Sequence, residues 1–241
     1  MTSPWAAPFL AAFPKPAKPA PAHVKPEPFA AQAGIEVLDG LLTETLLPFL
    51  DERIVRDRRL EQRGVADIVE RTLTGRLVEA AGRKGLTATP AKTKRSMADV
   101  HFQIEGADIS LDVKSRNVGA SFSMPNLISI DRLDTYYRKG SNVFVLLMAE
   151  YEEEEDEILF KDIRWMRAEE ICWDCLSIQN LGLGQLQITN AKNRIERFKG
   201  DRNEWMRRLR SEAAAFYGRL SEKSRIAQAE WLAKSWTCEE G

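Results

Sequence analysis

Residues 98–117, with the sequence ADVHFQIEGADISLDVKSRN, decide the fold of this chain. Apolar residues alternate with polar ones at positions 100, 102 and 104, and again at positions 109, 111 and 113. Glu105-Gly106 separates the two runs and provides the residues of a tight turn. This pattern predicts two neighbouring β-strands, each with one apolar face.

Acidic and basic side chains stand at the ends of these two predicted strands. Asp99 precedes the first strand, and Asp112 and Lys114 close the second. Because side chains alternate along a strand, Asp112 and Lys114 point to one face and Val113 points to the other. Two carboxylates and an ammonium group can together bind a divalent metal ion and activate a water molecule beside it. An exposed ion pair between Asp112 and Lys114 is the alternative, because short D-x-K strings are common by chance.

The composition is that of a globular protein and excludes several classes. Charged residues make up 29% of the 241 residues, and no apolar run approaches the roughly 20 residues of a membrane-spanning helix. The three cysteines, Cys172, Cys175 and Cys238, are typical of a protein in a reducing cytoplasm. A lone C-x-x-C pair does not make a zinc site, and no glycine-rich loop for a nucleotide cofactor is present. We therefore expect a cytoplasmic protein with no membrane contact and no nucleotide cofactor.

Charge is segregated along the chain, although the net charge is only −1. Residues 150–157 carry seven acidic groups, and residues 192–210 carry eight basic groups against three acidic ones. A basic face for nucleic acid can therefore exist on a nearly neutral protein. The basic run taken alone is at least as typical of a solvated helix surface.

The chain divides into an N-terminal arm and one domain. Residues 1–33 hold eight of the eleven prolines, interleaved with alanines, which predicts a flexible arm before a domain over residues 34–241. Helices are predicted over residues 34–62 with a kink at Pro48, 65–81, 127–137, 167–176 and from a capping box at residues 201–204 onward. Strands are predicted over residues 142–149, 158–166 and 185–189, with the acidic run as a solvated hairpin loop. This order predicts an α/β fold, a mixed β-sheet flanked by helices.

The residues around the two strands resemble a known family of nucleases. Asp99, Asp112 and Lys114 match the PD-(D/E)xK nuclease motif, with Ala98 in place of the usual proline. Three segments are similar to type II restriction endonucleases of the HindII/HincII group, and NEW at residues 203–205 is a weaker match. These segments are LDVKSRN at 111–117, PNLIS at 125–129, and LSI at 176–178 with QLQ at 185–187. The resemblance covers roughly residues 65–220 and leaves out the proline-rich arm.

The resemblance implies a restriction-endonuclease-like catalytic and DNA-binding domain. Such an enzyme is a homodimer that clamps double-stranded DNA and cuts both strands of a short palindromic site, with blunt 5′-phosphate ends. Asp99 and Asp112, with the Val113 carbonyl, would hold Mg²⁺, and Lys114 would stand beside the attacking water. Glu70, on a predicted helix, is a possible accessory acid, although a solvated glutamate is the alternative.

Three regions supply the residues predicted to bind DNA. Amide and guanidinium groups suit base edges in the major groove, whereas lysines more often bind phosphates. Met124 lies where related enzymes push a side chain into the DNA, and buried packing is its alternative. The predicted DNA-binding residues are Lys92, Lys94, Arg95 and Ser96; Ser115, Arg116, Asn117, Ser123, Met124 and Asn126; and Gln179 and Asn180. A structure- or mismatch-specific repair nuclease, and a DNA-binding protein without catalysis on the same fold, are the other readings of these features.

Overall fold

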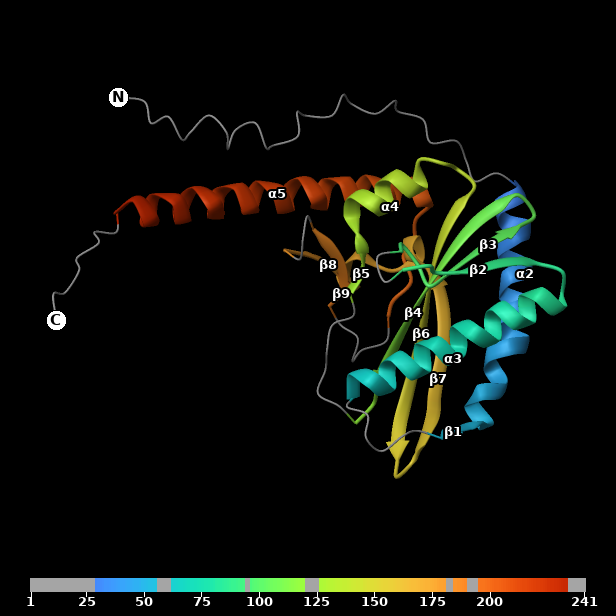
Figure 1. Ribbon diagram of the computed structural model, residues 1–241. Helices are drawn as coiled ribbons and strands as arrows, with labels where there is room; N and C mark the ends of the chain where they lie inside the picture. Colours follow the sequence, from blue (N-terminus) through green and yellow to red (C-terminus); the bar gives the residue numbers. More distant parts are fainter. Residues whose placement is uncertain are drawn as a thin grey trace.

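A computed structural model describes residues 29–55, 62–93, 96–119, 126–180, 184–189 and 195–233 (Figure 1). Its centre is a six-stranded sheet in the order β1-β7-β6-β4-β3-β2. Only the β4–β6 pairing is parallel, and the other pairs are antiparallel, so the sheet is mixed. The strands are β1 Arg53–Val55, β2 Thr87–Pro90, β3 Val100–Ile104, β4 Ala107–Asn117, β6 Asn142–Glu154 and β7 Glu157–Arg167.

The predicted hairpin lies at the middle of this sheet. Strands β3 and β4 pair antiparallel from Val100↔Leu111 to Ile104↔Ala107. The turn residues have positive φ angles, 49° at Glu105 and 77° at Gly106, as a two-residue hairpin turn requires. The parallel partner β6 is buried on both faces along residues 142–149, which confirms the predicted central strand.

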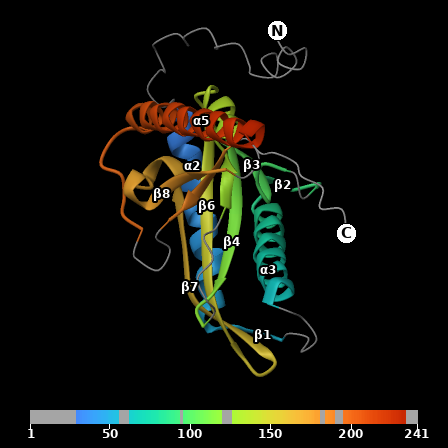
Figure 2. The same ribbon diagram turned by 90° about the vertical axis from the view of Figure 1, so that its left-hand side faces the viewer.

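Helices and a second sheet cover the two faces of the main sheet (Figures 1 and 2). Helices α2 Phe29–Leu46 and α3 Gln62–Arg83 pack on one face, against apolar residues such as Phe102, Leu111 and Val113. The other face is covered by α4 Ile130–Tyr137, α5 Arg202–Ala233 and a three-stranded sheet. That small sheet has the order β5 Asn126–Ser129, β9 Gln185–Ile188 and β8 Leu176–Gln179. The predicted fold class, a mixed sheet flanked by helices, is confirmed.

The long helix predicted over residues 34–62 is wrong at both ends. Helix α2 begins at Phe29, inside the predicted arm, and ends at Leu46; residues 1–28 of the arm lie outside the described residues. The 3-10 helix η1, Leu47–Asp51, and strand β1 follow it. Because Pro48 has no backbone N–H, it ends the α-helical hydrogen bonding where a kink was predicted. Helix α3 confirms the predicted helix over residues 65–81.

The acidic run is also not the predicted solvated loop. Strand β6 continues to Glu154 and β7 begins at Glu157, so the turn holds only residues 155 and 156. Tyr151 is buried, and neighbouring acids pair with basic residues of the adjoining strands, for example Glu152 with Lys161 at 2.8 Å. These cross-strand partners offset the charge that predicts a loop when the sequence is read locally.

Two further predicted helices are shorter or absent. The helix predicted over residues 127–137 begins at Ile130, because Asn126–Ser129 pairs with β9 as strand β5. The helix predicted over residues 167–176 is two 3-10 turns, η2 Ala168–Glu170 and η3 Trp173–Cys175. Backbone bonds from Cys172 and Phe198 tie this segment to residues 195–198 in place of a helix. The predicted capping box of α5 is confirmed, with Glu204 N–H donating to Asp201 Oδ1 at 2.8 Å and Asp201 N–H to Glu204 Oε2 at 3.1 Å.

Within the described residues, no helix combines the length and the apolar composition needed to cross a bilayer.

Helix α2 approaches the β3–β4 hairpin most closely at Gly34. A Cβ atom there would lie 2.6 Å from the Ile104 carbonyl oxygen and 2.9 Å from Ala107 Cβ. Because backbone cannot give way as a side-chain end can, Gly34→Ala is expected to lower the free energy of unfolding by about 1–3 kcal/mol. Gly40→Ala, in the same helix but with open space around the site, is the control and is expected to stabilise the protein slightly. Equal urea midpoints for the two variants would contradict this packing.

Candidate functional site

The candidate site arises because β4 is longer than β3. Pairing with β3 stops at Val100↔Leu111, whereas pairing of β4 with β6 continues to Asn117↔Tyr151. From Asp112 onward, the edge of β4 that faces away from β6 has no strand beside it within the described residues. Side chains from the loop before β3 and from helix α3 fill that edge instead. The predicted catalytic residues therefore meet where a strand is missing.

Asp99 occupies the first position along this edge. Its N–H donates to the Leu111 carbonyl at 2.9 Å, and its Oδ2 accepts from the Val113 N–H at 2.7 Å. The carboxylate thus continues the hydrogen bonding of β3 beyond the end of that strand. Because the N–H and C=O of one strand residue point to the same side, the Val113 carbonyl also faces this edge. The proposed metal-binding groups of Asp99 and Val113 therefore lie side by side.

Asp112 and Lys114 share one face of β4, as predicted. Lys114 Nζ lies 2.8 Å from Asp112 Oδ2, with side-chain exposures of 25% and 8%. The contact lacks hydrogen-bond geometry, so Asp112 Oδ2 is a buried oxygen without a hydrogen bond. Burial raises the pKa of Asp112 to about 7, although the Lys114 charge opposes the shift. The surrounding carboxylates raise the pKa of Lys114 in spite of its own burial.

Glu70 reaches the same site from helix α3. Its Oε1 accepts from the Ser115 N–H at 3.2 Å and from the Ser115 hydroxyl at 3.0 Å. Burial raises the pKa of Glu70, the Lys114 charge lowers it, and the Asp99 charge raises it. Glu70 is thus a member of the cluster, whereas the alternative was a solvated glutamate. Ser115, predicted to bind DNA, holds Glu70 in this structure.

The charges of this cluster suit a divalent cation. Glu70, Asp99 and Asp112 influence one another electrostatically, and Lys114 is the ammonium among them. Three carboxylates against one ammonium leave an excess of negative charge, and their hard oxygen atoms are the ligands that Mg²⁺ prefers. Among the described residues, no three carboxylate, histidine or cysteine groups already surround one point. An ion bound here would compete with Lys114 for Asp112 Oδ2, which lies 2.8 Å from Lys114 Nζ.

The predicted DNA-binding loop before β3 is described only in part. Lys92 is exposed, and Ser96 is half-buried with its N–H bonded to the Thr93 carbonyl at 3.0 Å. Lys94 and Arg95 lie outside the described residues, as do Ser123 and Met124. The proposed wedge at Met124 therefore stays a prediction.

Two predicted DNA-binding residues next to Lys114 already have protein partners. Arg116 Nη2 donates to Glu150 Oε1 at 2.8 Å, and Asn117 Nδ2 donates to Glu153 Oε1 at 2.7 Å. Both acceptors belong to the acidic run. The first residues of this run lie on β6, which pairs with β4. Contacts of these two residues with DNA would compete with the two glutamates.

The other predicted DNA-binding residues gather on the small sheet. Strand pairing places Asn126 opposite Gln187, and Gln179 opposite Gln185. Gln187 Nε2 donates to Asn126 Oδ1, while Gln187 Oε1 is buried without a hydrogen bond. Because the alternate residues of β8 and β9 pack into the core, this sheet has one apolar face and one face of amides. Asn180 is exposed at the end of β8.

Glu150 and Arg164 lie beside the site but were missed from the sequence. Glu150 was read as part of a loop, and Arg164 as an ordinary strand residue. Glu150 Oε1 also accepts from Arg164 Nη2 at 3.1 Å, so one carboxylate oxygen holds two guanidinium groups. The alternation of residues 158–166 could have placed Arg164 on a face, but only the register of β7 against β6 shows which face.

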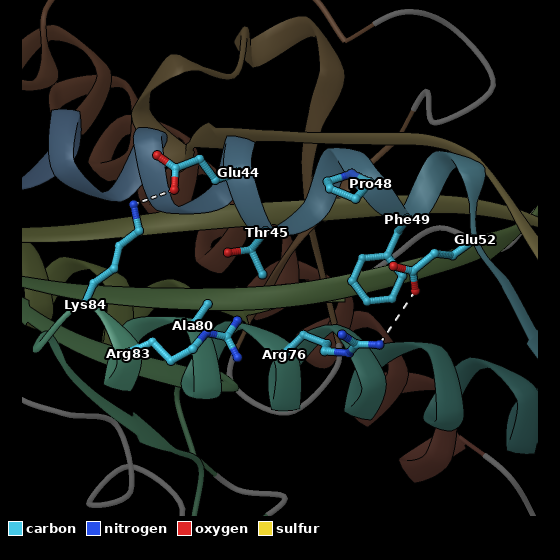
Figure 3. Close-up of a pocket in the computed structure, with 9 residues that line it drawn as sticks. All are labelled: Glu44, Thr45, Pro48, Phe49, Glu52, Arg76, Ala80, Arg83 and Lys84. Atoms are coloured by element: carbon cyan, nitrogen blue, oxygen red, sulfur yellow. Dashed lines mark ion pairs between the residues drawn. The ribbon is translucent and has the colours of Figure 1, made fainter.

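A separate surface pocket of about 320 Å³ lies between α2, η1 and α3 (Figure 3). Its basic groups are matched by acids, with Lys84 Nζ 2.5 Å from Glu44 Oε2 and Arg76 Nη2 3.7 Å from Glu52 Oε2. Arg76 also lies over the ring of Phe49, 5.5 Å from its centre. None of the residues that line this pocket belongs to the carboxylate cluster.

The raised pKa of Asp112 predicts a pH dependence of stability in the absence of metal. A carboxyl with a higher pKa in the folded state binds more protons when folded, so its contribution is fully present below its ordinary value of 3.8. That contribution is lost as the pH rises towards about 7, and Glu70 shifts in the same direction. In EDTA, urea unfolding is therefore expected to show stability falling across this window.

Asp112→Asn separates this effect from others in the molecule. The variant is expected to flatten the fall in EDTA, because the amide binds no proton. Mg²⁺ at pH 8 is expected to raise the melting temperature of the wild type and to leave that of Asp112→Asn nearly unchanged. An Asp112→Asn variant whose stability changes between pH 4 and pH 7 in EDTA by as much as that of the wild type would contradict the assignment.

Comparisons with known proteins complete the description. No protein-family model matches the chain, and no curated protein matches it. Among solved structures, the chain is similar to the NlaIV restriction endonuclease, with a TM-score of 0.47 and 13% sequence identity over 85% of this chain and 92% of that chain.

Proposed function

We propose that this protein is a Mg²⁺-dependent endonuclease that hydrolyses phosphodiester bonds in double-stranded DNA. One observation carries the proposal: the open edge of β4 brings Glu70, Asp99, Asp112 and Lys114 together from three separate segments. A structural ion pair needs two of these groups, and two further carboxylates would only add repulsion to it. A cation-binding site accounts for all four of these groups.

The residues of the cluster have distinct proposed roles. Asp99, Asp112 and the Val113 carbonyl would hold Mg²⁺, with Glu70 as an accessory acid. The bound ion would act as a Lewis acid towards a phosphate oxygen. Lys114 would orient the attacking water, stabilise it as it loses its proton, and offset negative charge that develops on the phosphate. In-line attack would leave a 5′-phosphate and a 3′-hydroxyl.

The finer proposal is a type II restriction endonuclease similar to the HindII/HincII group. Such an enzyme would act in the cytoplasm as a homodimer on a short palindromic site, with blunt cutting. The amide face of the small sheet is the proposed base-reading surface, because amide side chains make bidentate hydrogen bonds to adenine in the major groove. Two residues predicted from the sequence, Asn126 and Gln179, belong to that face, and Gln187 beside Asn126 is buried.

Incubation with unmethylated plasmid DNA tests this function. With Mg²⁺ the wild type is expected to give discrete fragments, and sequencing of their ends would give the site and the cut position. Asp112→Asn is the matched control, expected to bind duplex DNA without metal and not to cut it. Nicking of branched or mismatched DNA alone would favour a repair nuclease instead. Binding without any cutting, in Mg²⁺ or Mn²⁺, would leave a DNA-binding protein and exclude the endonuclease.

Ser115 offers a test of Glu70 that does not alter a carboxylate. Ser115→Ala removes the 3.0 Å hydrogen bond from the hydroxyl to Glu70 and keeps the backbone bond. The variant is expected to need about tenfold more Mg²⁺ for half-maximal cleavage, because groups that orient a ligand tune metal affinity. Ser115→Thr keeps the hydroxyl and is expected to behave like the wild type. Identical Mg²⁺ titrations for the alanine and threonine variants would remove Glu70 from the site.

A further inference from the structure

Next to Lys114, the site face of the main sheet carries a row of charged residues across three strands. Arg116 on β4 is in register with Glu150 on β6, whereas Arg164 on β7 is in register with Met148, the residue of β6 that pairs with Lys114. Because side chains alternate along each strand, all three charged residues share the face on which Lys114 lies. Arg116 and Glu150 lie one step, roughly 7 Å, further along their strands than the level of Lys114, and Arg164 lies level with Lys114, two strands or roughly 10 Å away.

Glu150 organises this row through a single oxygen atom. Its Oε1 accepts from Arg116 Nη2 at 2.8 Å and from Arg164 Nη2 at 3.1 Å. Arg164 is also held by Asp162, with Nη1 3.3 Å from Oδ2. Both arginines are fixed at the shared carboxylate, and each keeps a partly exposed side chain, 28% for Arg116 and 33% for Arg164.

The chemistry of this row suits a phosphodiester. Guanidinium groups present several donors in a planar fork that matches two phosphate oxygens. Arg164 still has an unused donor, because its buried Nε makes no hydrogen bond. The Arg164 side chain as a whole is one-third exposed, so the outer N–H groups of its guanidinium can be reached by a phosphate oxygen. A DNA strand whose scissile phosphate lies beside Lys114 would carry a neighbouring phosphate over this row.

We propose that Arg164 binds a backbone phosphate next to the scissile one, and that Glu150 is the positioning residue that fixes Arg164 and Arg116 for this contact. The proposal rests on the proposed function, since it takes DNA as the ligand. Arg164 would then contribute to the affinity for DNA and to the placement of the DNA strand. Base recognition stays with other residues.

Binding of a fluorescently labelled duplex in EDTA, measured over a series of salt concentrations, tests the phosphate contact. Arg164→Gln is expected to weaken binding about tenfold on unrelated sequences and to reduce the slope of log affinity against log salt by about one. Arg83→Gln is the matched control, because Arg83 also pairs with a glutamate, at 2.6 Å, but lies on α3 among the residues lining the separate pocket. Equal affinity and slope for the two variants would overturn the proposal.

Arg164→Lys is a second variant, which keeps the proposal testable if Arg164→Gln does not fold. It keeps the charge and is expected to keep the salt slope while losing part of the affinity, because an ammonium lacks the fork. An affinity equal to that of the wild type would exclude a guanidinium–phosphate fork. The role of Glu150 is tested by a double-mutant cycle, in which Glu150→Gln is expected to shrink the effect of Arg164→Gln. Fully additive effects would remove Glu150 as the positioning residue.

Cleavage assays keep this proposal separate from the endonuclease itself. If the wild type cuts DNA while Arg164→Gln binds like Arg83→Gln, only the phosphate contact fails. If the wild type binds duplex with the expected salt slope but cuts nothing, only the endonuclease fails. In that second case Arg164 would still be a residue that binds DNA phosphate.

Discussion

Lys114→Met is expected to reduce the rate of DNA cleavage by about 10²–10⁴-fold at saturating Mg²⁺ and DNA. Methionine keeps most of the side-chain volume and removes the ammonium group found among the three carboxylates. The attacking water would then lose the charge that stabilises it as it gives up its proton. Single-turnover cleavage of a short duplex gives the rate, and duplex binding in EDTA is expected to stay close to that of the wild type.

Lys84→Met is the matched control for this prediction. Lys84 also forms an ion pair, with Glu44 at 2.5 Å, but it lines the pocket between α2 and α3. Its replacement is expected to leave the cleavage rate unchanged. Both variants are compared well below their melting temperatures, because Lys114→Met leaves buried carboxylates without their ammonium partner. A Lys114→Met enzyme that cuts within tenfold of the wild-type rate would exclude Lys114 from the chemical step.

Arg202→Met is expected to lower the free energy of unfolding by about 3–5 kcal/mol. Arg202 is the first residue of α5, and its Nη2 lies 2.7 Å from Glu169 Oε1, with both side chains almost fully buried. Arg202 also donates from Nη1 to the Asn142 carbonyl at 3.1 Å and lies 4.8 Å above the ring of Tyr137. Tyr137 in turn donates to Glu169. Loss of the guanidinium would leave the buried Glu169 carboxylate with the more distant Arg167, whose Nη1 lies 4.0 Å from Glu169 Oε1.

Urea denaturation of three variants separates this cause from a general loss of packing. Arg210→Met, in the same helix, breaks an exposed pair with Asp134 at 2.9 Å and is expected to cost at most about 1 kcal/mol. Adding Glu169→Gln to Arg202→Met is expected to restore part of the stability, because the buried charge is gone. Equal losses for Arg202→Met and Arg210→Met would show that the buried pair has no special importance.

The parts of the fold that follow from short-range pattern were predictable. The alternation around Glu105-Gly106 predicts strands β3 and β4, and the same alternation places Asp112 and Lys114 on one face. The capping box at Asp201 depends only on neighbouring residues, and it was also predicted. In these cases the interactions that determine the structure join residues close together in the chain. The local sequence is therefore enough to predict the structure.

The parts that depend on distant partners were not predictable in the same way. Strand β5 forms because Asn126 pairs with Gln187, and only the segment that contains Gln187 was predicted as a strand. Glu70 lies at the edge of a helical face, but only the packing of α3 against the sheet brings it to Ser115. The acidic run was predicted to be a loop because its local sequence shows only repelling charges. The basic residues that pair with it, such as Lys161 and Arg116, belong to other strands.

The open edge of β4 makes the carboxylate cluster depend on completed folding. Its groups come from α3, from the loop before β3 and from β4, and β4 is held in place by β6, which is synthesised later. A chain that has not yet formed β6 therefore has no assembled cluster. Local opening of α3 would likewise withdraw Glu70 from the cluster before the sheet itself unfolds. Hydrogen exchange of α3 amides would then report how often Glu70 leaves the cluster.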